Sequence, residues 1–138
     1  MIVVDASVWV SYLLPPDANH AASRRWLAAR LTEGEALVAP VLLLAEVAGA
    51  IARQTNRPQL GQKTIDRLLS VPNLRLVSLD HVSGIRAART AAECQLCGAD
   101  AIYVDTAAAL HAPLVSWDRQ QLERAGQIVL AYAPDQPG

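Results

Sequence analysis

Short apolar runs alternate with longer amphipathic stretches along most of this chain. The runs at 2–4, 36–39 and 114–116 are short and almost wholly apolar, which is typical of strands buried on both faces of a sheet. Two further strands are expected at 74–79, where polar and apolar residues alternate, and at 128–131. Strands separated by helical segments predict an α/β fold, a three-layer sandwich with a central, mainly parallel β-sheet.

Helices are expected between these strands, where apolar residues recur at helical spacing. The expected ranges are 6–14, 19–31, 40–54, 59–69, 100–110 and 119–125, together with a fifth helix, before 100–110, that begins at Asp80 or Ser83 and ends at about 96. Pro15 ends the first helix and Pro40 stands near the start of the third, because proline is tolerated only in the first turn. Asn19 is the expected N-cap of the second helix, and Gly98 is expected to separate the last two long ones.

The length of 138 residues predicts one domain, residues 1–132, followed by a loose tail at 133–138. Hydrophobic residues make up 52% of the chain, which indicates a globular protein. No apolar run approaches the roughly 18 residues that a membrane helix needs, and the N-terminus lacks the basic start of a secretory signal. These features predict a cytoplasmic protein with no membrane partner.

The net charge of −1 excludes a protein that binds polyanions through its overall charge. Eleven of the twelve basic residues are Arg, since Lys63 is the only Lys, so any contact with nucleic acid must come from local arginines. The two cysteines, Cys94 and Cys97, lie about one helical turn apart with no further zinc ligands at matching spacing. We therefore expect two reduced thiols.

Four carboxylates interrupt or border apolar segments that lie far apart in the sequence. They are Asp5, Glu46, Asp100 and Asp118. A carboxylate in apolar surroundings is costly unless it is paired or bound to a cation, and most of these acids have no Lys or Arg beside them. Four oxygen ligands of this kind point to one shared cation site.

Each acid also has a purely structural interpretation. Asp5, Asp100 and Asp118 stand where an Asp commonly caps the helix that follows it. Glu46 is harder to explain in this way, because apolar residues surround it and none of its neighbours three or four positions away is basic. A fifth acid, Asp105, lies about 140° around the helix from Asp100. Two interpretations are open: it lines the same cleft as a further candidate metal ligand, or it faces solvent.

Four short motifs stand around these acids, at 3–7, at 39–40 followed by 44–47, at 98–103 and at 114–119. In this order and spacing, they resemble the motifs of the PIN-domain ribonucleases, and among them of the VapC-type toxins of toxin–antitoxin pairs. The resemblance implies that Asp5, Glu46, Asp100 and Asp118 form an acidic quartet that binds Mg²⁺ or Mn²⁺ and cleaves RNA. It further implies that Ser7 and Ser116 steady the acids or the water bound to the metal. Asp105 departs from the family pattern, so the resemblance assigns it no role.

The chemistry of phosphodiester hydrolysis agrees with this interpretation, since divalent ions activate water and stabilise the charge that develops on the phosphate. His20, His81 and His111 lie outside the acidic motifs, which disfavours a metal-free histidine ribonuclease. The resemblance also implies a cognate antitoxin as a partner. Surplus apolar residues at 41–54 and 59–69, together with the resemblance, predict a homodimer.

Three alternatives stay open. In the first, the chain is a housekeeping PIN nuclease that matures RNA. In the second, it is a catalytically idle PIN module that binds RNA or protein. A phosphoacceptor signalling domain is weaker, because it requires a second acid beside the strand-end Asp and a Lys late in the chain, whereas the only Lys is Lys63.

Overall fold

A single parallel sheet forms the centre of the molecule in the computed structural model, which describes residues 1–136. Its strands are β1 (Ile2–Val4), β2 (Leu37–Pro40), β3 (Leu74–Val77), β4 (Leu114–Val115) and β5 (Ala131–Tyr132). They lie in the order β3-β2-β1-β4-β5, and every neighbouring pair is parallel. The sheet confirms the predicted parallel arrangement.

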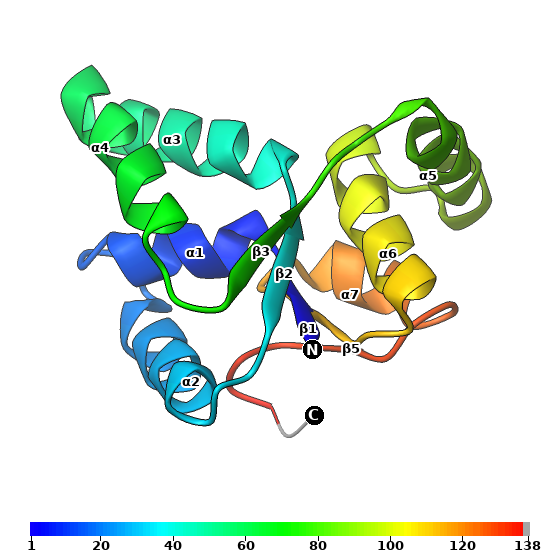
Figure 1. Cartoon of the computed structure of the whole chain (residues 1–138), viewed down its shortest axis with the longest axis horizontal. Coiled ribbons are helices and arrows are strands. Elements are labelled where there is room, and N and C mark those ends of the chain that lie inside the picture. Colours follow the sequence, from blue (N-terminus) through cyan, green and yellow to red (C-terminus); the bar gives the residue numbers. More distant parts are fainter. Residues whose placement is uncertain (137–138) are drawn as a thin grey trace.

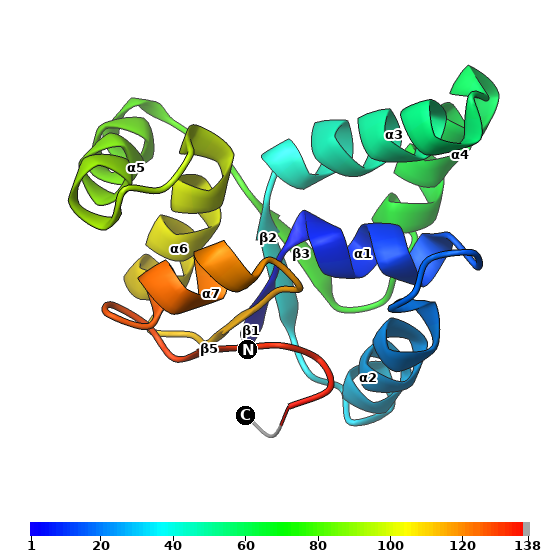
Figure 2. The ribbon, with the colours of Figure 1, turned by 180° about the vertical axis from the view of Figure 1, so that it is seen from behind.

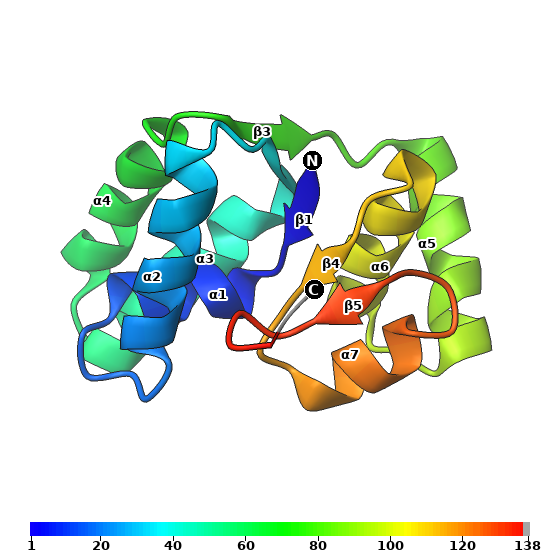
Figure 3. The same ribbon diagram turned by 90° about the horizontal axis from the view of Figure 1, so that it is seen from below.

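Seven helices cover the two faces of this sheet. They are α1 (Ala6–Leu13), α2 (His20–Thr32), α3 (Leu42–Thr55), α4 (Pro58–Leu69), α5 (His81–Cys94), α6 (Gly98–Leu110) and α7 (Arg119–Ala125). Helices α1 to α4 lie on one side of the sheet and α5 to α7 on the other, as Figures 1, 2 and 3 show from three directions. The molecule is therefore the three-layer α/β sandwich that the sequence predicts.

The strand order places the first strand at the centre of the sheet. From β1 the chain builds outward through β2 to β3, and then returns to the other side of β1 to form β4 and β5. The change of direction lies between β1 and β4. In open α/β sheets, ligands bind at the carboxyl ends of the strands next to such a switch point. Asp5 and Ser116 follow β1 and β4 directly, so both stand at this place.

The core is built from the central strands and the helix faces against them. All of β1, β2 and β4 is buried, and the largest fully buried side chains include Trp9, Leu27 and Tyr103. Trp9 comes from α1 and Tyr103 from α6, so each layer of helices contributes one of the largest fully buried side chains.

Several predicted boundaries are wrong by a few residues. Pro40 is the last residue of β2 instead of the start of a helix. Gly98 begins α6 instead of standing between helices, and α5 ends at Cys94, since its C-cap Gln95 has a left-handed backbone. The last strand lies at 131–132 instead of 128–131, since residues 128 and 130 are exposed apolar positions of a loop.

Residues 133–136 of the predicted tail form a turn in which the backbone N–H of Gln136 donates to the carbonyl of Ala133. The rest of that tail, 137–138, lies outside the described residues. Within residues 1–136, no helix combines the length and apolar character required to cross a bilayer.

Candidate active site

Asp5 stands at the carboxyl end of the central strand and is almost fully buried, with 6% of its surface exposed. Its Oδ2 accepts a hydrogen bond from the backbone N–H of Ser7 at 2.9 Å and one from Ser116 Oγ at 3.3 Å. Its Oδ1 accepts a bond from Gln121 Nε2 at 3.3 Å. Asp5 therefore caps α1, as the structural interpretation expects, and is also held from β4 and α7.

Ser7 and Ser116 join the two strand ends beside Asp5. Their hydroxyl oxygens lie 3.3 Å apart. Ser7 Oγ accepts the backbone N–H of Trp117 at 3.0 Å, and Ser116 Oγ accepts that of Asp118 at 3.0 Å. These bonds fix the turn after β1 against the turn after β4, so the hydroxyls set the relative position of the acids in both turns.

Asp118 lies at the exposed rim of the same region. Its Oδ1 accepts the backbone N–H of Gln121 at 3.0 Å, which makes Asp118 the N-cap of α7. Capping and a role in the site are compatible here, because a carboxylate has two oxygens and the cap uses only one of them.

Asp100 lies in the first turn of α6 and does not cap that helix, because the N-cap residue is Cys97. The capping alternative is therefore wrong for Asp100. Partial burial raises the pKa of Asp100 above its ordinary value, and the negative charges of Asp118 and Asp5 raise it further. The hydrogen bond with Cys97 lowers that pKa, but by less than burial raises it.

Glu46 projects from α3, from the other side of the sheet, and is half-buried. Burial raises the pKa of Glu46, and the charges of Asp5 and Asp100 add to the increase. The hydroxyl of Tyr103 donates a 2.7 Å hydrogen bond to Glu46 Oε2 and opposes this increase. Burial, followed by the charge of Glu46, in turn raises the pKa of Tyr103, so the phenol stays a donor.

Hydrogen bonds link the segments that carry the four carboxylates. Ser116 bonds to Asp5 and to the backbone N–H of Asp118, and Gln121 bonds to Asp5 and to the carbonyl of Asp100. Tyr103, one turn after Asp100 on α6, bonds to Glu46. In residues 1–136, no group of three His, Cys, Asp or Glu side chains is arranged closely enough to enclose a metal ion directly. The donor set nevertheless fits Mg²⁺ or Mn²⁺, because such ions keep several waters and use one or two carboxylates directly.

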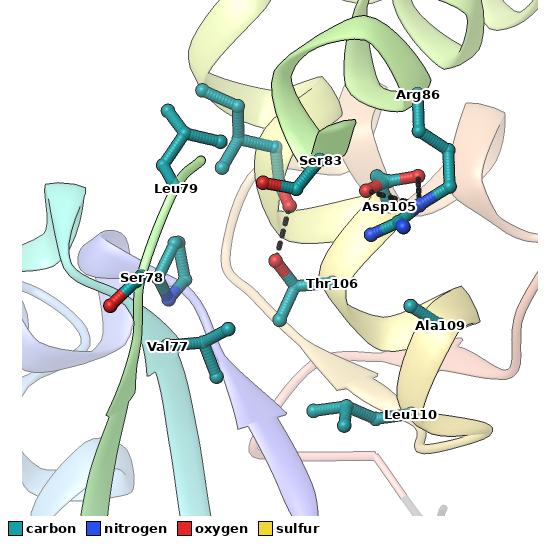
Figure 4. A pocket seen from close by; sticks show the side chains of 11 residues that line it. Val77, Ser78, Leu79, Ser83, Arg86, Asp105, Thr106, Ala109 and Leu110 are labelled. Carbon is teal, nitrogen blue, oxygen red and sulfur yellow. Dashed lines mark hydrogen bonds and ion pairs between the residues drawn. The ribbon is translucent and has the colours of Figure 1, made fainter. Parts of the chain in front are cut away.

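Asp105 is occupied elsewhere. Its two carboxylate oxygens accept bonds from Arg86 Nε at 2.8 and 3.0 Å, and its side chain is buried. Figure 4 shows this pair between α5 and α6, in a small pocket with Ser83 and Thr106 that includes none of the four acids. The ion pair supplies the partner that a buried carboxylate requires, so Asp105 has a structural explanation.

Two residues of this region were missed in the sequence. Tyr103 lies three residues after Asp100, one turn along the same face of α6. That spacing is the signal in the sequence that Tyr103 belongs to the site. Gln121 is fully buried, and its Nε2 also approaches the carbonyl of Asp100 at 3.5 Å. Nothing in the polar segment 119–124 distinguishes Gln121 from its exposed neighbours.

The two cysteines are free thiols, with Cys94 buried and Cys97 exposed. The observed state agrees with the reduced thiols that the sequence predicts. Cys97 stands beside Asp100 at the start of α6, whereas Cys94 packs into the core from the last turn of α5.

The chain was compared with protein families, with curated proteins and with solved structures. The model of the PIN domain family matches residues 2–127. No curated protein matches the sequence. The structure is similar to VapC20 of Mycobacterium tuberculosis, described as a sarcin–ricin loop cleaving toxin, with 16% identity, a TM-score of 0.74 and coverage of 86% of this chain and 90% of that chain.

Two further solved structures share the fold. FitAcB from Neisseria gonorrhoeae is 20% identical with a TM-score of 0.72, over 97% of this chain and 98% of that chain. A toxin–antitoxin complex from Klebsiella pneumoniae contains a chain that is 14% identical with a TM-score of 0.65, over 99% of this chain and 100% of that chain. At these identities the likeness establishes a common fold.

Proposed function

Because the chain belongs to the PIN domain family, we propose that it is a metal-dependent endoribonuclease and the toxin of a toxin–antitoxin pair. The observation that carries this proposal is the set of four carboxylates that face one region. Among the described residues, 1–136, none of the four forms an ion pair with Lys, Arg or His. Carboxylates that repel one another without a basic partner favour a divalent cation.

Asp5, Glu46, Asp100 and Asp118 would hold Mg²⁺ or Mn²⁺ in this proposal. Such an ion, when bound, supplies an activated water and stabilises charge on the phosphate. Other side chains of the protein hold the acids in position. Ser7 and Ser116 fix the strand ends, and the Tyr103 hydroxyl orients Glu46.

The partners in this proposal are an RNA substrate, a cognate antitoxin and a second copy of the chain. The known toxin–antitoxin complex with this fold supports the antitoxin. An apolar groove between the end of α1 and the pair α3–α4, lined by Leu13, Leu14 and Leu60 among others, supports an interface on that side. Light scattering on the isolated protein tests the homodimer, and a strict monomer at tens of micromolar would exclude it.

The decisive experiment is incubation of the purified protein with total cellular RNA and Mn²⁺, with cut sites mapped by sequencing. We expect specific cuts that EDTA abolishes and that addition of the co-expressed antitoxin suppresses. RNA left intact at all metal concentrations would favour the idle RNA- or protein-binding module. Cuts confined to precursor RNA, with no antitoxin gene beside this one, would favour a housekeeping role in RNA maturation.

A further inference from the structure

A groove about 410 Å³ in volume leads away from Glu46 along α3. Helices α1 and α3, which form its walls, lie side by side in Figures 1 and 2. The lining residues are Ala6, Ser7 and Val10 from α1 and Ala45, Glu46, Ala50 and Arg53 from α3. The groove therefore has an acid of the proposed site near one end, small side chains along it, and one cation.

The guanidinium of Arg53 lies back along α3 toward the acids. A Cβ atom built on Gly49 would lie only 3.0 Å from Arg53 Nη1, so the arginine head rests over this glycine. Gly49 follows Glu46 by three residues, which is about 4.5 Å along a helix axis. The guanidinium therefore lies over the turn of α3 that follows Glu46, although Arg53 itself is seven residues from Glu46 in the sequence.

Among residues 1–136, Arg53 has no acidic partner that would neutralise it. The side chain is exposed, and none of the ion pairs among residues 1–136 includes it. By contrast, Arg86 is paired with Asp105 and the guanidinium of Arg67 lies over the ring of Tyr12. Arg53 therefore presents a free charge and a planar set of donors to whatever occupies the groove.

We propose that Arg53 binds the phosphate next to the one that is cleaved, and that the intervening nucleotide of the RNA lies over the small side chains of the groove. The proposal rests on the proposed function, because it takes the scissile phosphate to lie at the carboxylates. A guanidinium forks onto phosphate oxygens with good geometry. It also offsets the repulsion between an anionic strand and four acids.

The variants needed for a test are simple because Arg53 is exposed. Arg53→Ala removes the charge, and Arg53→Lys keeps the charge without the fork. Arg89→Ala is the matched control, since Arg89 is an exposed arginine of α5, on the opposite side of the sheet in Figure 1. Equal melting temperatures for the four proteins will show that the fold is unchanged.

The first measurement is the anisotropy of a labelled single-stranded oligoribonucleotide in EDTA, over a range of KCl concentrations. A plot of log affinity against log salt has a negative slope, and loss of one phosphate contact makes that slope less steep by about 0.7 for a single strand. We expect this change for Arg53→Ala, with affinity about three- to tenfold weaker at low salt, but not for Arg53→Lys or Arg89→Ala. A slope for Arg53→Ala equal to that of Arg89→Ala would overturn the proposal.

The second measurement is steady-state cleavage of an RNA that contains the mapped cut site. Arg53→Ala should raise KM with little change in kcat, because the contact holds substrate and transition state alike. Replacing the phosphate next to the cut by a neutral methylphosphonate should raise KM for the wild type but not for Arg53→Ala. Equal increases in both proteins would show that Arg53 does not contact that phosphate.

These measurements separate the two proposals. If the wild type cleaves RNA and Arg53→Ala matches it in affinity and KM, the phosphate contact is wrong and the nuclease stands. If the wild type never cleaves RNA but Arg53→Ala lowers the salt slope, the nuclease is wrong while Arg53 still binds a nucleic acid strand.

Discussion

Tyr103 supplies the only side-chain hydrogen bond to Glu46 among the described residues, and it comes from the opposite layer of the sandwich. Tyr103→Phe removes this donor at nearly constant volume. The bond lowers the pKa of Glu46, so its loss should raise that pKa further. We expect cleavage at pH 7 to fall by about 10-fold or more, and the acidic limb of the pH–rate profile to move to higher pH.

The matched control is Tyr12→Phe, because Tyr12 packs against Trp9 and Arg67 away from the acids. It should leave the rate and its pH dependence unchanged. Wild-type activity in Tyr103→Phe would mean that the phenol contributes packing alone.

Asp100 allows a test of charge at one position. Asp100→Asn should abolish cleavage and keep the fold, since it removes a charged ligand without changing volume. Burial and the charges of Asp118 and Asp5 raise the pKa of Asp100, so the neutral amide should also raise the melting temperature without metal, by roughly 2–4 °C. Asp66→Asn, at an exposed position of α4, is the control for loss of one negative charge. An Asp100→Asn protein that cleaves RNA at the wild-type rate would remove Asp100 from the site.

At the scale of elements, the predictions that succeeded rest on local signals. The predicted bounds are correct for β1 (Ile2–Val4) and for α7 (Arg119–Ala125). An Asp marks each of these boundaries, because Asp5 caps the helix after β1 and Asp118 caps α7. The last strand was misplaced because residues 128 and 130 are apolar yet exposed, and burial is not visible in a short apolar run. The partners of Glu46 and Asp105 could not be predicted, since Tyr103 and Arg86 reach them only through the packing of whole helices.

The pairing of α3 with α4 depends on one glycine. A Cβ on Gly61 would lie 2.5 Å from the backbone oxygen of Ala48 and 2.9 Å from Ala52 Cβ, and a backbone atom cannot move aside cheaply. Gly61→Ala should therefore force the helices apart and lower the free energy of unfolding by about 1–3 kcal/mol, measured by urea denaturation.

Gly84 of α5 provides the opposite case, because a Cβ there meets nothing within 4 Å. Gly84→Ala should raise the free energy of unfolding by about 0.5–1 kcal/mol through helix propensity alone. Equal effects of the two substitutions would show that the close approach of α3 and α4 does not limit stability.

At the scale of the whole molecule, the sheet order brings distant segments to one place. The sequence predicts the layers and the parallel sheet, and with them the carboxyl ends where Asp5 and Asp118 stand. It also predicts a cation site shared by Glu46 and Asp100, but not the packing that brings α3 and α6, from opposite layers, to the same place. That proximity depends on how the helices pack, which brings the Tyr103 hydroxyl of α6 within 2.7 Å of Glu46 Oε2 of α3.

The same proximity predicts how stability depends on pH without metal. Glu46 and Asp100 have pKa values raised in the folded state, mainly by burial, so the folded protein takes up their protons before the unfolded chain does as pH falls. Their destabilising effect is full at neutral pH and disappears below their unfolded values, near pH 4 to 4.5. Asp80 acts in the opposite sense, because its capping bonds with Ser83 lower its pKa, but its contribution is lost only at more acidic pH.

We therefore expect the melting temperature in EDTA to rise as pH falls from neutral toward the unfolded pKa values of these two acids. Mn²⁺ should raise it at pH 7 by replacing repulsion with coordination, and binding should release protons. Because protons compete for the same oxygens, the shift caused by Mn²⁺ should shrink as pH approaches 5. The Asp100→Asn protein should show a weaker dependence on both pH and Mn²⁺, whereas the Asp66→Asn control should behave as the wild type. An Mn²⁺ shift that is the same at neutral and at acidic pH, or a pH dependence in EDTA that is the same for Asp100→Asn and the wild type, would contradict a metal site built from these carboxylates.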